Sequence, residues 1–313
     1  MTTNIIKIGS RKSALALWQT HFVREGLLKN FPHLSIEIVH IDTIGDRTQE
    51  QNLPLPEIGG KGLFTQELET ALRNRQIDLA VHSLKDLPTA LEPDFQIAAI
   101  PERAPAFDVL VSKGDVSFSA LSAGAVIGTS SLRRSAQLKR LRPDISYMSI
   151  RGNVDTRIRK VRDNEAPYSA TVLAHAGIIR LDRTQEISHI FSADEILPAP
   201  GQGALAVQCR SNDVVVQDFV KVLHHLETEY AVTAERSFLG YLMAGCNTPV
   251  GAFAEIKGTI INMQGRCLSA DGSHCIEVSG SDHLENAKSL GERLAKDALS
   301  KGAKELLAKY ENQ

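Results

Sequence analysis

Short apolar runs alternate with helical patterns of apolar residues in the first third of the chain. Strands are predicted at 5–8, 36–43 and 77–82, and helices after the polar turn 9–13 and over 63–74. Strands that alternate with helices usually form a parallel sheet, so about 100 residues here are predicted to be an α/β unit.

The same order of strand, polar turn and helix restarts near residue 126. The strand 126–127 leads into Gly128-Thr129-Ser130-Ser131 and a helix from about Leu132, and further strands (145–150, 171–174) flank a helix at 153–162. The turn is similar to Ile8-Gly9-Ser10 in the first unit. Two doubly wound α/β lobes are therefore predicted, and the sequence leaves open whether they form a true structural repeat.

The pattern changes from about Thr228. A helix is predicted to about Met243, followed by strands at 250–256, 259–269 and 273–279 that two-residue turns join, and then by a long amphipathic helix. The C-terminal part is thus predicted to be a small α+β domain with a three-stranded antiparallel sheet.

Composition and charge narrow the function classes. A chain of 313 residues exceeds what one hydrophobic core usually supports, so two or three domains are expected. The start lacks a signal-peptide pattern, and no apolar run approaches about 18 residues, so we expect a cytoplasmic protein without a membrane span. The net charge is −2, but the segment 133–162 holds ten Lys and Arg against two acids. With Tyr147 as its single aromatic, that segment does not suit nucleic acid.

Arginines and hydroxyl residues gather where the predicted helices begin. Free backbone N–H groups and the helix dipole favour anions there, and a guanidinium matches a carboxylate with two hydrogen bonds. Each arginine alone could equally be a solvated surface residue. Their shared position indicates a receptor for a ligand with several acid groups, built from Arg11, Ser13, Ser130, Ser131, Arg133, Arg134, Arg151 and Arg157.

Polar residues also crowd the end of the strand 77–82, where His82, Ser83, Lys85 and Asp86 follow one another closely. A carboxylate at this place could stabilise a developing cation and pass protons. The sequence alone favours the simpler alternative, a capped loop with a surface ion pair.

The four cysteines show no metal-binding or disulfide spacing. In the predicted meander Cys275 opposes Leu268, which puts Cys267 on the other face and argues against a disulfide between the two. Cys209 lies in an apolar run and is expected to be buried. Cys246 lies in a loop, so it is the candidate if one thiol takes part in chemistry.

Seven motifs in order resemble the porphobilinogen deaminase family from end to end. They are RKSALALWQ (11–19), GGKGLF (59–64), VHSLKD (81–86), GTSSLRR (128–134), RGNV (151–154), LPAPGQGA (197–204) and Gly245-Cys246. The resemblance implies two lobes like those of periplasmic binding proteins and a third, cofactor-bearing domain. It also implies a monomer that acts on porphobilinogen.

The resemblance further implies that Cys246 carries a dipyrromethane cofactor through a thioether, assembled by the enzyme from its own substrate. Porphobilinogen units are then added one at a time with loss of ammonia until a hexapyrrole is reached, and hydroxymethylbilane is released by hydrolysis. Asp86 is implied as the catalytic carboxylate. The residues implied to hold cofactor and substrate carboxylates are Arg11, Ser13, Ser83, Lys85, Thr129, Ser131, Arg133, Arg134, Arg151, Arg157 and Arg180.

The expected domains are 1–102 with about 201–221, then 103–200, and finally 222–313. The segment 104–108 departs from the acidic-proline-arginine-aspartate run usual in the family, which puts its hinge contacts in doubt. Ala244, Asn247 and Thr248 replace the family's common glycine, glutamine and valine around the thiol. The main rival interpretation is a two-lobed binding protein without catalysis, which would leave Cys246 and Asp86 without a role.

Overall fold

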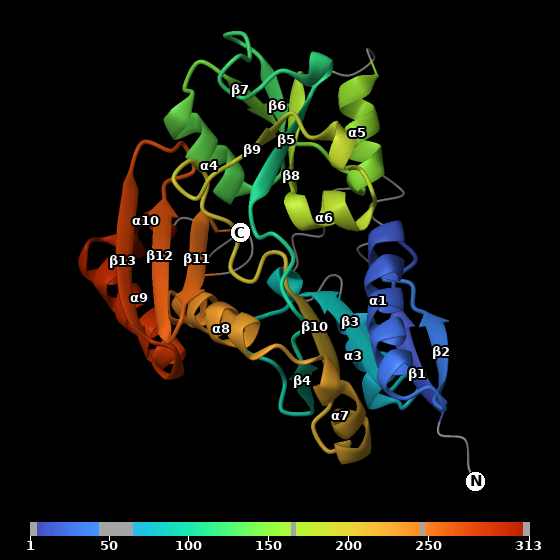
Figure 1. The fold of residues 1–313 in the computed structure, drawn as a ribbon. Helices are drawn as coiled ribbons and strands as arrows, with labels where there is room; N and C mark the ends of the chain where they lie inside the picture. Colours follow the sequence, from blue (N-terminus) through green and yellow to red (C-terminus); the bar gives the residue numbers. More distant parts are fainter. Residues whose placement is uncertain (1–4, 44–64, 164–166, 245–247, 309–313) are drawn as a thin grey trace. The chain divides into compact units, whose positions relative to one another are not determined.

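The computed structural model describes residues 5–43, 65–163, 167–244 and 248–308 (Figure 1). The chain folds into two compact units. The first comprises 1–104 with 204–229, and the second comprises 105–203 with 230–313. No helix among the described residues is long and apolar enough to cross a membrane.

The first unit contains a five-stranded sheet in the order β2-β1-β3-β10-β4. Successive residues are buried along its strands β3 and β10, so both faces of the sheet need cover. Helices α1 and α7 pack on one face through Val23, Leu27 and Val216, while α3 packs on the other through Leu68 and Leu72. The elements are β1 (Ile5–Ser10), α1 (Ala14–Asn30), β2 (Ser35–His40), α3 (Gln66–Arg73), β3 (Leu79–Ser83), β4 (Phe95–Ala99), β10 (Leu205–Arg210) and α7 (Val214–Val220).

The second unit contains a sheet in the order β7-β6-β8-β5-β9, covered on one face by α4 and on the other by α5 and α6. Leu138 of α4 packs against Leu110 and Val172, and Ile158 of α5 packs against their strand neighbours on the opposite face. The elements are β5 (Asp108–Ser112), β6 (Val126–Gly128), α4 (Leu132–Leu141), β7 (Ser146–Met148), α5 (Val154–Arg162), β8 (Ala170–Ala174), α6 (His175–Arg180) and β9 (His189–Ile190).

The two sheets share one topology, which supports the structural repeat that the sequence left open. In each, the first strand of the strand-turn-helix pattern is second in the order and parallel to both of its neighbours, and the fourth strand in the order is antiparallel to its neighbours. That antiparallel strand is β10 in one sheet and β5 in the other. The sequence predicted the two α/β lobes but not the direction of β10 and β5, because both lie in continuous apolar runs, and such runs carry no sign of strand direction.

The C-terminal part of the second unit confirms the predicted meander. Three antiparallel strands, β11 (Val250–Lys257), β12 (Ile260–Leu268) and β13 (Cys275–His283), pack against α8 (Leu226–Tyr241), α9 (Ala287–Ser300) and the short α10 (Ala303–Leu307). Cys275 opposes Leu268, as the turn predicted, and Cys267 and Cys275 are free thiols. Gly272, at φ +75°, lies so close to the backbone of α4 that a Cβ would meet the carbonyl oxygen of Ala136 at 2.4 Å.

Candidate active site

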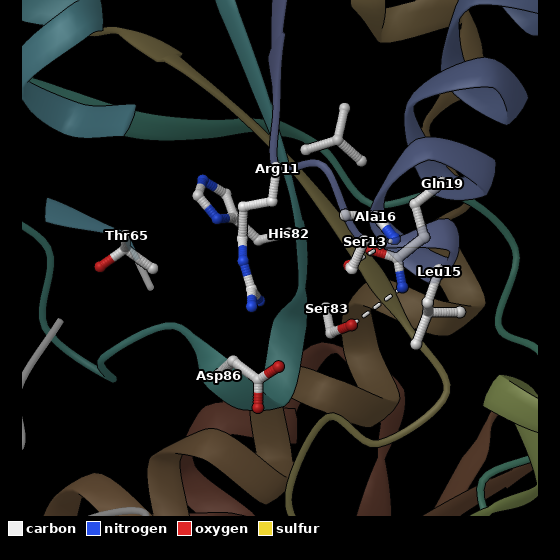
Figure 2. Close-up of a pocket in the computed structure, with 10 residues that line it drawn as sticks. Arg11, Ser13, Leu15, Ala16, Gln19, Thr65, His82, Ser83 and Asp86 are labelled. Carbon is white, nitrogen blue, oxygen red and sulfur yellow. Dashed lines mark hydrogen bonds between the residues drawn. The ribbon is translucent and has the colours of Figure 1, made fainter. Parts of the chain in front are cut away.

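The first group of predicted residues lies at the carboxyl ends of β1 and β3. These strands are parallel neighbours, so the residues that follow them, Arg11 after β1 and Ser83 at the end of β3, come to one edge of the sheet. They line a pocket with an empty volume of about 450 Å³, part of it open to solvent (Figure 2). The described lining residues are Arg11, Ser13, Leu15, Ala16, Gln19, Thr65, Val81, His82, Ser83 and Asp86.

Two serine hydroxyls of this pocket each retain a hydrogen that they can donate. Ser13 is the N-cap of α1, where its Oγ accepts from the Ala16 N–H at 3.3 Å. The Oγ of Ser83 accepts from Nε2 of buried Gln19 at 2.9 Å. A hydroxyl whose oxygen already accepts from an N–H retains one hydrogen to donate. Both serines therefore suit an acceptor such as a carboxylate.

Asp86 lies in the 3-10 turn Leu84–Asp86 that follows β3, and its side chain is exposed. Within the described part of the chain it makes no ion pair or hydrogen bond, so the surface ion pair considered for this strand tip does not involve Asp86. Figure 2 shows the Arg11 side chain reaching toward the Asp86 carboxylate. Lys85 precedes Asp86 in the turn but is not among the residues that line the pocket.

The second group of predicted residues is centred on Asp108, at the start of β5. Its carboxylate is fully buried and accepts from Nη1 of Arg133 at 2.7 Å and from Nε and Nη2 of Arg134 at 3.0 and 2.7 Å. Nε2 of Gln202 donates to the same carboxylate at 3.0 Å. Burial alone would raise the pKa of Asp108, but the two guanidinium cations outweigh it and hold the pKa well below its usual range.

The arginines around Asp108 carry more positive charge than it neutralises. Asp108 balances one of its two partners, and Arg157 has no carboxylate partner within the described residues, its Nε donating instead to the Gly152 carbonyl at 2.8 Å. Burial, and then the Arg134 cation, lower the pKa of Arg157 to about 10. The guanidinium stays charged at neutral pH, so this region favours an anion.

Two hydroxyls near α4 repeat the donor arrangement of the first pocket. The Ser131 Oγ accepts from the Arg134 N–H at 3.4 Å, and Oγ1 of the buried Thr129 accepts from the Ser131 N–H at 3.2 Å. Ser130 differs, because its hydroxyl already donates to the Ile150 carbonyl at 2.8 Å.

The two remaining arginines of the predicted set also lie in the second unit. Arg151 is half-buried between β7 and α5. Arg180, at the end of α6, is buried, and its Nη2 donates to the Gly203 carbonyl at 2.6 Å. Burial lowers the pKa of Arg180 to about 10, so it too stays charged at neutral pH.

Sequence reasoning missed four residues in or beside these groups: Gln19, Thr65, Asp108 and Gln202. It named His82 at the strand tip but gave it no role. Gln19 and Gln202 are amides inside recognised motifs, but only the folded chain shows what they contact. Cys246 and the motif 59–64 lie outside the described residues. Among the described residues no group of three or more His, Cys, Asp or Glu is placed to hold a metal ion.

Comparison with known proteins gives matches over nearly the whole chain. Residues 6–218 match the family model "Porphobilinogen deaminase, dipyromethane cofactor binding domain", and residues 229–300 match "Porphobilinogen deaminase, C-terminal domain". The chain is 43% identical over 304 residues to a porphobilinogen deaminase of Chloroherpeton thalassium, covering 96% of each chain. It is 41% identical over 308 residues to one of Geobacter sulfurreducens, covering 98% of this chain and 95% of the relative.

Solved structures match at lower similarity. The methionine binding protein MetQ is 12% identical, with 71% of this chain and 90% of that chain covered and a TM-score of 0.46. A Candida albicans gene product described as having the generic periplasmic binding protein fold is 14% identical, with 76% and 72% covered and a TM-score of 0.37.

Replacing Asp108 by Asn should lower the free energy of unfolding at pH 7 by about 3–5 kcal/mol, because two buried guanidinium groups lose their counter-ion. The folded-state pKa of Asp108 is depressed, so its contribution is present above its unfolded pKa of about 3.9 and is lost as the pH falls below that value. Urea unfolding of both proteins from pH 7 to pH 2.5 should therefore show a difference that shrinks below about pH 4.

The matched control is Asp115→Asn, which removes an exposed partner of Arg162 in the same unit and should change stability far less. Equal losses for the two variants, or a difference that is constant with pH, would contradict the role given to Asp108.

Proposed function

The chain belongs to the porphobilinogen deaminase family, and on that premise we propose that the two groups of residues described above bind and process pyrroles. Such an enzyme is a transferase of tetrapyrrole biosynthesis. It joins porphobilinogen units on a dipyrromethane cofactor with loss of ammonia, and then releases hydroxymethylbilane by hydrolysis.

We assign the carboxylates of cofactor and substrate to the guanidinium groups and to the hydroxyls that retain a hydrogen to donate. Every pyrrole of this chemistry carries an acetate and a propionate, which only accept hydrogen bonds at neutral pH. The proposed binding residues are Arg11, Ser13, Ser83, Lys85, Thr129, Ser131, Arg133, Arg134, Arg151, Arg157 and Arg180. What supports the assignment most is the excess of positive charge around Asp108, which a bound dicarboxylate would neutralise.

Arg133 and Arg134 have a double role in this proposal. Their bonds to Asp108 fix the two guanidinium planes, since Arg134 is also held by the Val172 carbonyl and Arg133 by the Leu197 carbonyl. Three N–H groups of Arg133 and two of Arg134 are not used in these bonds. Fixed guanidinium groups with donors to spare lose little conformational entropy when a carboxylate binds.

Asp86 is proposed as the catalytic carboxylate. Its oxygens would accept hydrogen bonds from pyrrole N–H groups, assist departure of the amine, and stabilise the azafulvenium cation that is left on the substrate. Its exposure in the pocket and its lack of a cationic partner among the described residues support this role, because a carboxylate already neutralised by the protein would stabilise a new cation less.

Cys246 is proposed as the attachment point of the dipyrromethane, through a thioether. The residues present fit such a group, since the uncompensated arginine charge suits its carboxylates. When bound, the cofactor supplies the pyrrole carbon to which the first substrate is joined. The protein's own part is to hold carboxylates, to place the Asp86 carboxylate beside the pyrrole nitrogens and to retain the thiol.

The finer organisation is also a proposal. We divide the chain into an α/β lobe (1–102 with about 201–221), a second α/β lobe (103–200) and a cofactor-bearing α+β domain (222–313). Three sheets with separate hydrophobic clusters support this division. We further propose a cytoplasmic monomer that binds neither nucleic acid nor a membrane, which size-exclusion chromatography with light scattering would test for the monomer.

The purified protein should have an intact mass above that of its sequence by one dipyrromethane. The Cys246→Ser variant should lack the increment, while Cys275→Ser, a half-buried thiol on β13, should retain it. Mass spectrometry of the denatured proteins measures this directly. Wild-type protein that consumes porphobilinogen but has the unmodified mass would overturn the proposed attachment.

Asp86→Asn should reduce kcat for porphobilinogen by about 100-fold or more, because the amide cannot neutralise a developing cation. The fold should persist, since Asp86 makes no contact within the described residues that the substitution breaks. Stopped assays of porphobilinogen consumption, with circular dichroism as the folding check, measure both. Asp218→Asn, on an exposed pair of α7, is the control and should keep wild-type kcat. Near-normal turnover by Asp86→Asn would exclude the catalytic role.

Arg157→Gln should raise the KM for porphobilinogen about tenfold, since it removes a charge that we assign to a ligand carboxylate. Stability should not fall, because the lost guanidinium has no carboxylate partner within the described residues. Arg159→Gln, an exposed position on the same helix, should change neither quantity. If Arg157→Gln destabilised the protein and left KM unaltered, Arg157 would be a structural residue instead.

A further inference from the structure

A chain of three side chains runs from helix α3 to the wall of the pocket. His82 on β3 and Gln208 on β10 lie on one face of adjacent antiparallel strands, where His82 pairs with Ala206 and Gln208 with Ala80. A hydrogen bond of 2.9 Å joins Nε2 of His82 to Oε1 of Gln208. Gln208 in turn donates from Nε2 to Oε1 of Glu69 on α3, also at 2.9 Å.

The direction of these hydrogen bonds determines which nitrogen of the His82 ring carries the hydrogen. The Glu69 carboxylate accepts, so it selects the amide nitrogen of Gln208 and turns the amide oxygen toward His82. That oxygen can only accept, so Nε2 of His82 must carry the hydrogen. In the neutral ring Nδ1 then has the lone pair, and it has no hydrogen-bond partner among the described residues.

The surroundings of His82 keep the ring neutral. Its side chain is 6% exposed, and burial, assisted by the Arg11 cation, lowers the pKa of His82 to about 4, although the bond to Gln208 acts in the opposite direction. Figure 2 shows the imidazole beside the Arg11 side chain and on the same pocket wall as Ser83. The charged residues near this chain of three side chains include Glu69, which accepts from Gln208, and Arg11 and Asp86, which line the same pocket as His82.

We propose that His82 is a substrate-binding residue whose Nδ1 accepts a hydrogen bond from the aminomethyl ammonium of porphobilinogen, with Gln208 and Glu69 fixing the tautomer that makes this possible. The inference rests on the proposed function of the pocket. The ligand's carboxylates require donors, which Arg11, Ser13 and Ser83 provide. Its amine requires acceptors, and a charged imidazole would repel it.

The neutral state also separates the role of His82 from that of Asp86. A ring that stays unprotonated at neutral pH is a poor proton carrier there, so His82 holds the amine while Asp86 responds to the charge that develops as the amine leaves. Loss of the Nδ1 acceptor should therefore weaken binding of the substrate more than it slows the chemical step.

The first test uses the wild-type holoenzyme with ¹⁵N-labelled histidine. Long-range ¹⁵N–¹H spectra between pH 5.5 and 8 should show His82 as a neutral Nε2–H tautomer throughout, with its resonances assigned by comparison with His82→Gln. An Nδ1–H tautomer, or a ring that gains a proton within this range, would overturn the proposal without reference to activity.

The second test replaces His82 by Asn or by Gln, whose side-chain amides each imitate one of the two ring nitrogens. Asn places an oxygen near the position of Nδ1, while Gln reaches toward Gln208 but offers no acceptor at Nδ1. His82→Gln should raise the KM for porphobilinogen about tenfold with kcat within about threefold of wild type, and His82→Asn should recover much of the KM. His21→Gln, an exposed position on α1, is the control and should behave as wild type.

A third test asks whether His82 contacts the amine of the substrate. It uses a pyrrole inhibitor that has a methyl group in place of the aminomethyl group of porphobilinogen. Its inhibition constant should be the same for wild type and for His82→Gln, because it lacks the amine. An equal weakening of the inhibitor and of porphobilinogen, or a KM for His82→Gln equal to that of wild type, would reject the assignment to the amine.

The failure of this inference is distinguishable from the failure of the proposed function. Arg11→Leu tests the pocket itself. If Arg11→Leu raises the KM strongly and His82→Gln does not, the pocket binds substrate and only the role of His82 is wrong. If neither variant changes the KM, the assignment of this pocket to the substrate is wrong as well.

Discussion

The buried carboxylate of Asp108 is the constraint on which the second unit depends. It joins the first residue of β5 to the first turn of α4 through Arg133 and Arg134, and to the loop before β10 through Gln202. A fully buried carboxylate is tolerated only because it is paired and hydrogen-bonded. Two cations for one anion leave the region positive, so the same pair that fixes the fold also prepares it for an anionic ligand.

The pocket of the first unit is also prepared for a ligand, but by the orientation of hydrogen-bonding groups and not by a buried ion pair. Each of its two serine oxygens accepts from an N–H group, one in the first turn of α1 and one of Gln19, and each hydroxyl retains a hydrogen to donate. Its histidine is made an acceptor by an amide and a carboxylate behind it. The pocket wall thus has donors for carboxylates and neutral or negative acceptors for N–H groups, which matches a pyrrole that carries both kinds of group.

Buried glutamine amides orient the donor and acceptor groups of both sites. Gln19 orients Ser83, Gln208 orients His82, and Gln202 holds Asp108, and none of the three was singled out from the sequence as a site residue. An amide offers both a donor and an acceptor at one end, so a buried amide transmits the direction of a hydrogen bond from one neighbour to the next. Substituting such a residue is expected to change the chemistry of the side chain that it orients.

The sequence by itself determined the family, the two α/β lobes, the meander with Cys275 opposite Leu268, and the strand ends where Arg11, Ser83 and Asp86 lie. These features depend on local periodicity and on the fixed geometry of strand-turn-helix units. Only the tertiary structure decided that β10 and β5 are antiparallel, that Asp86 has no described ion-pair partner, and that Arg133 and Arg134 share Asp108. Each of these depends on contacts between residues far apart in the chain. The type of a residue and its neighbours in sequence do not specify which distant residue it contacts after folding.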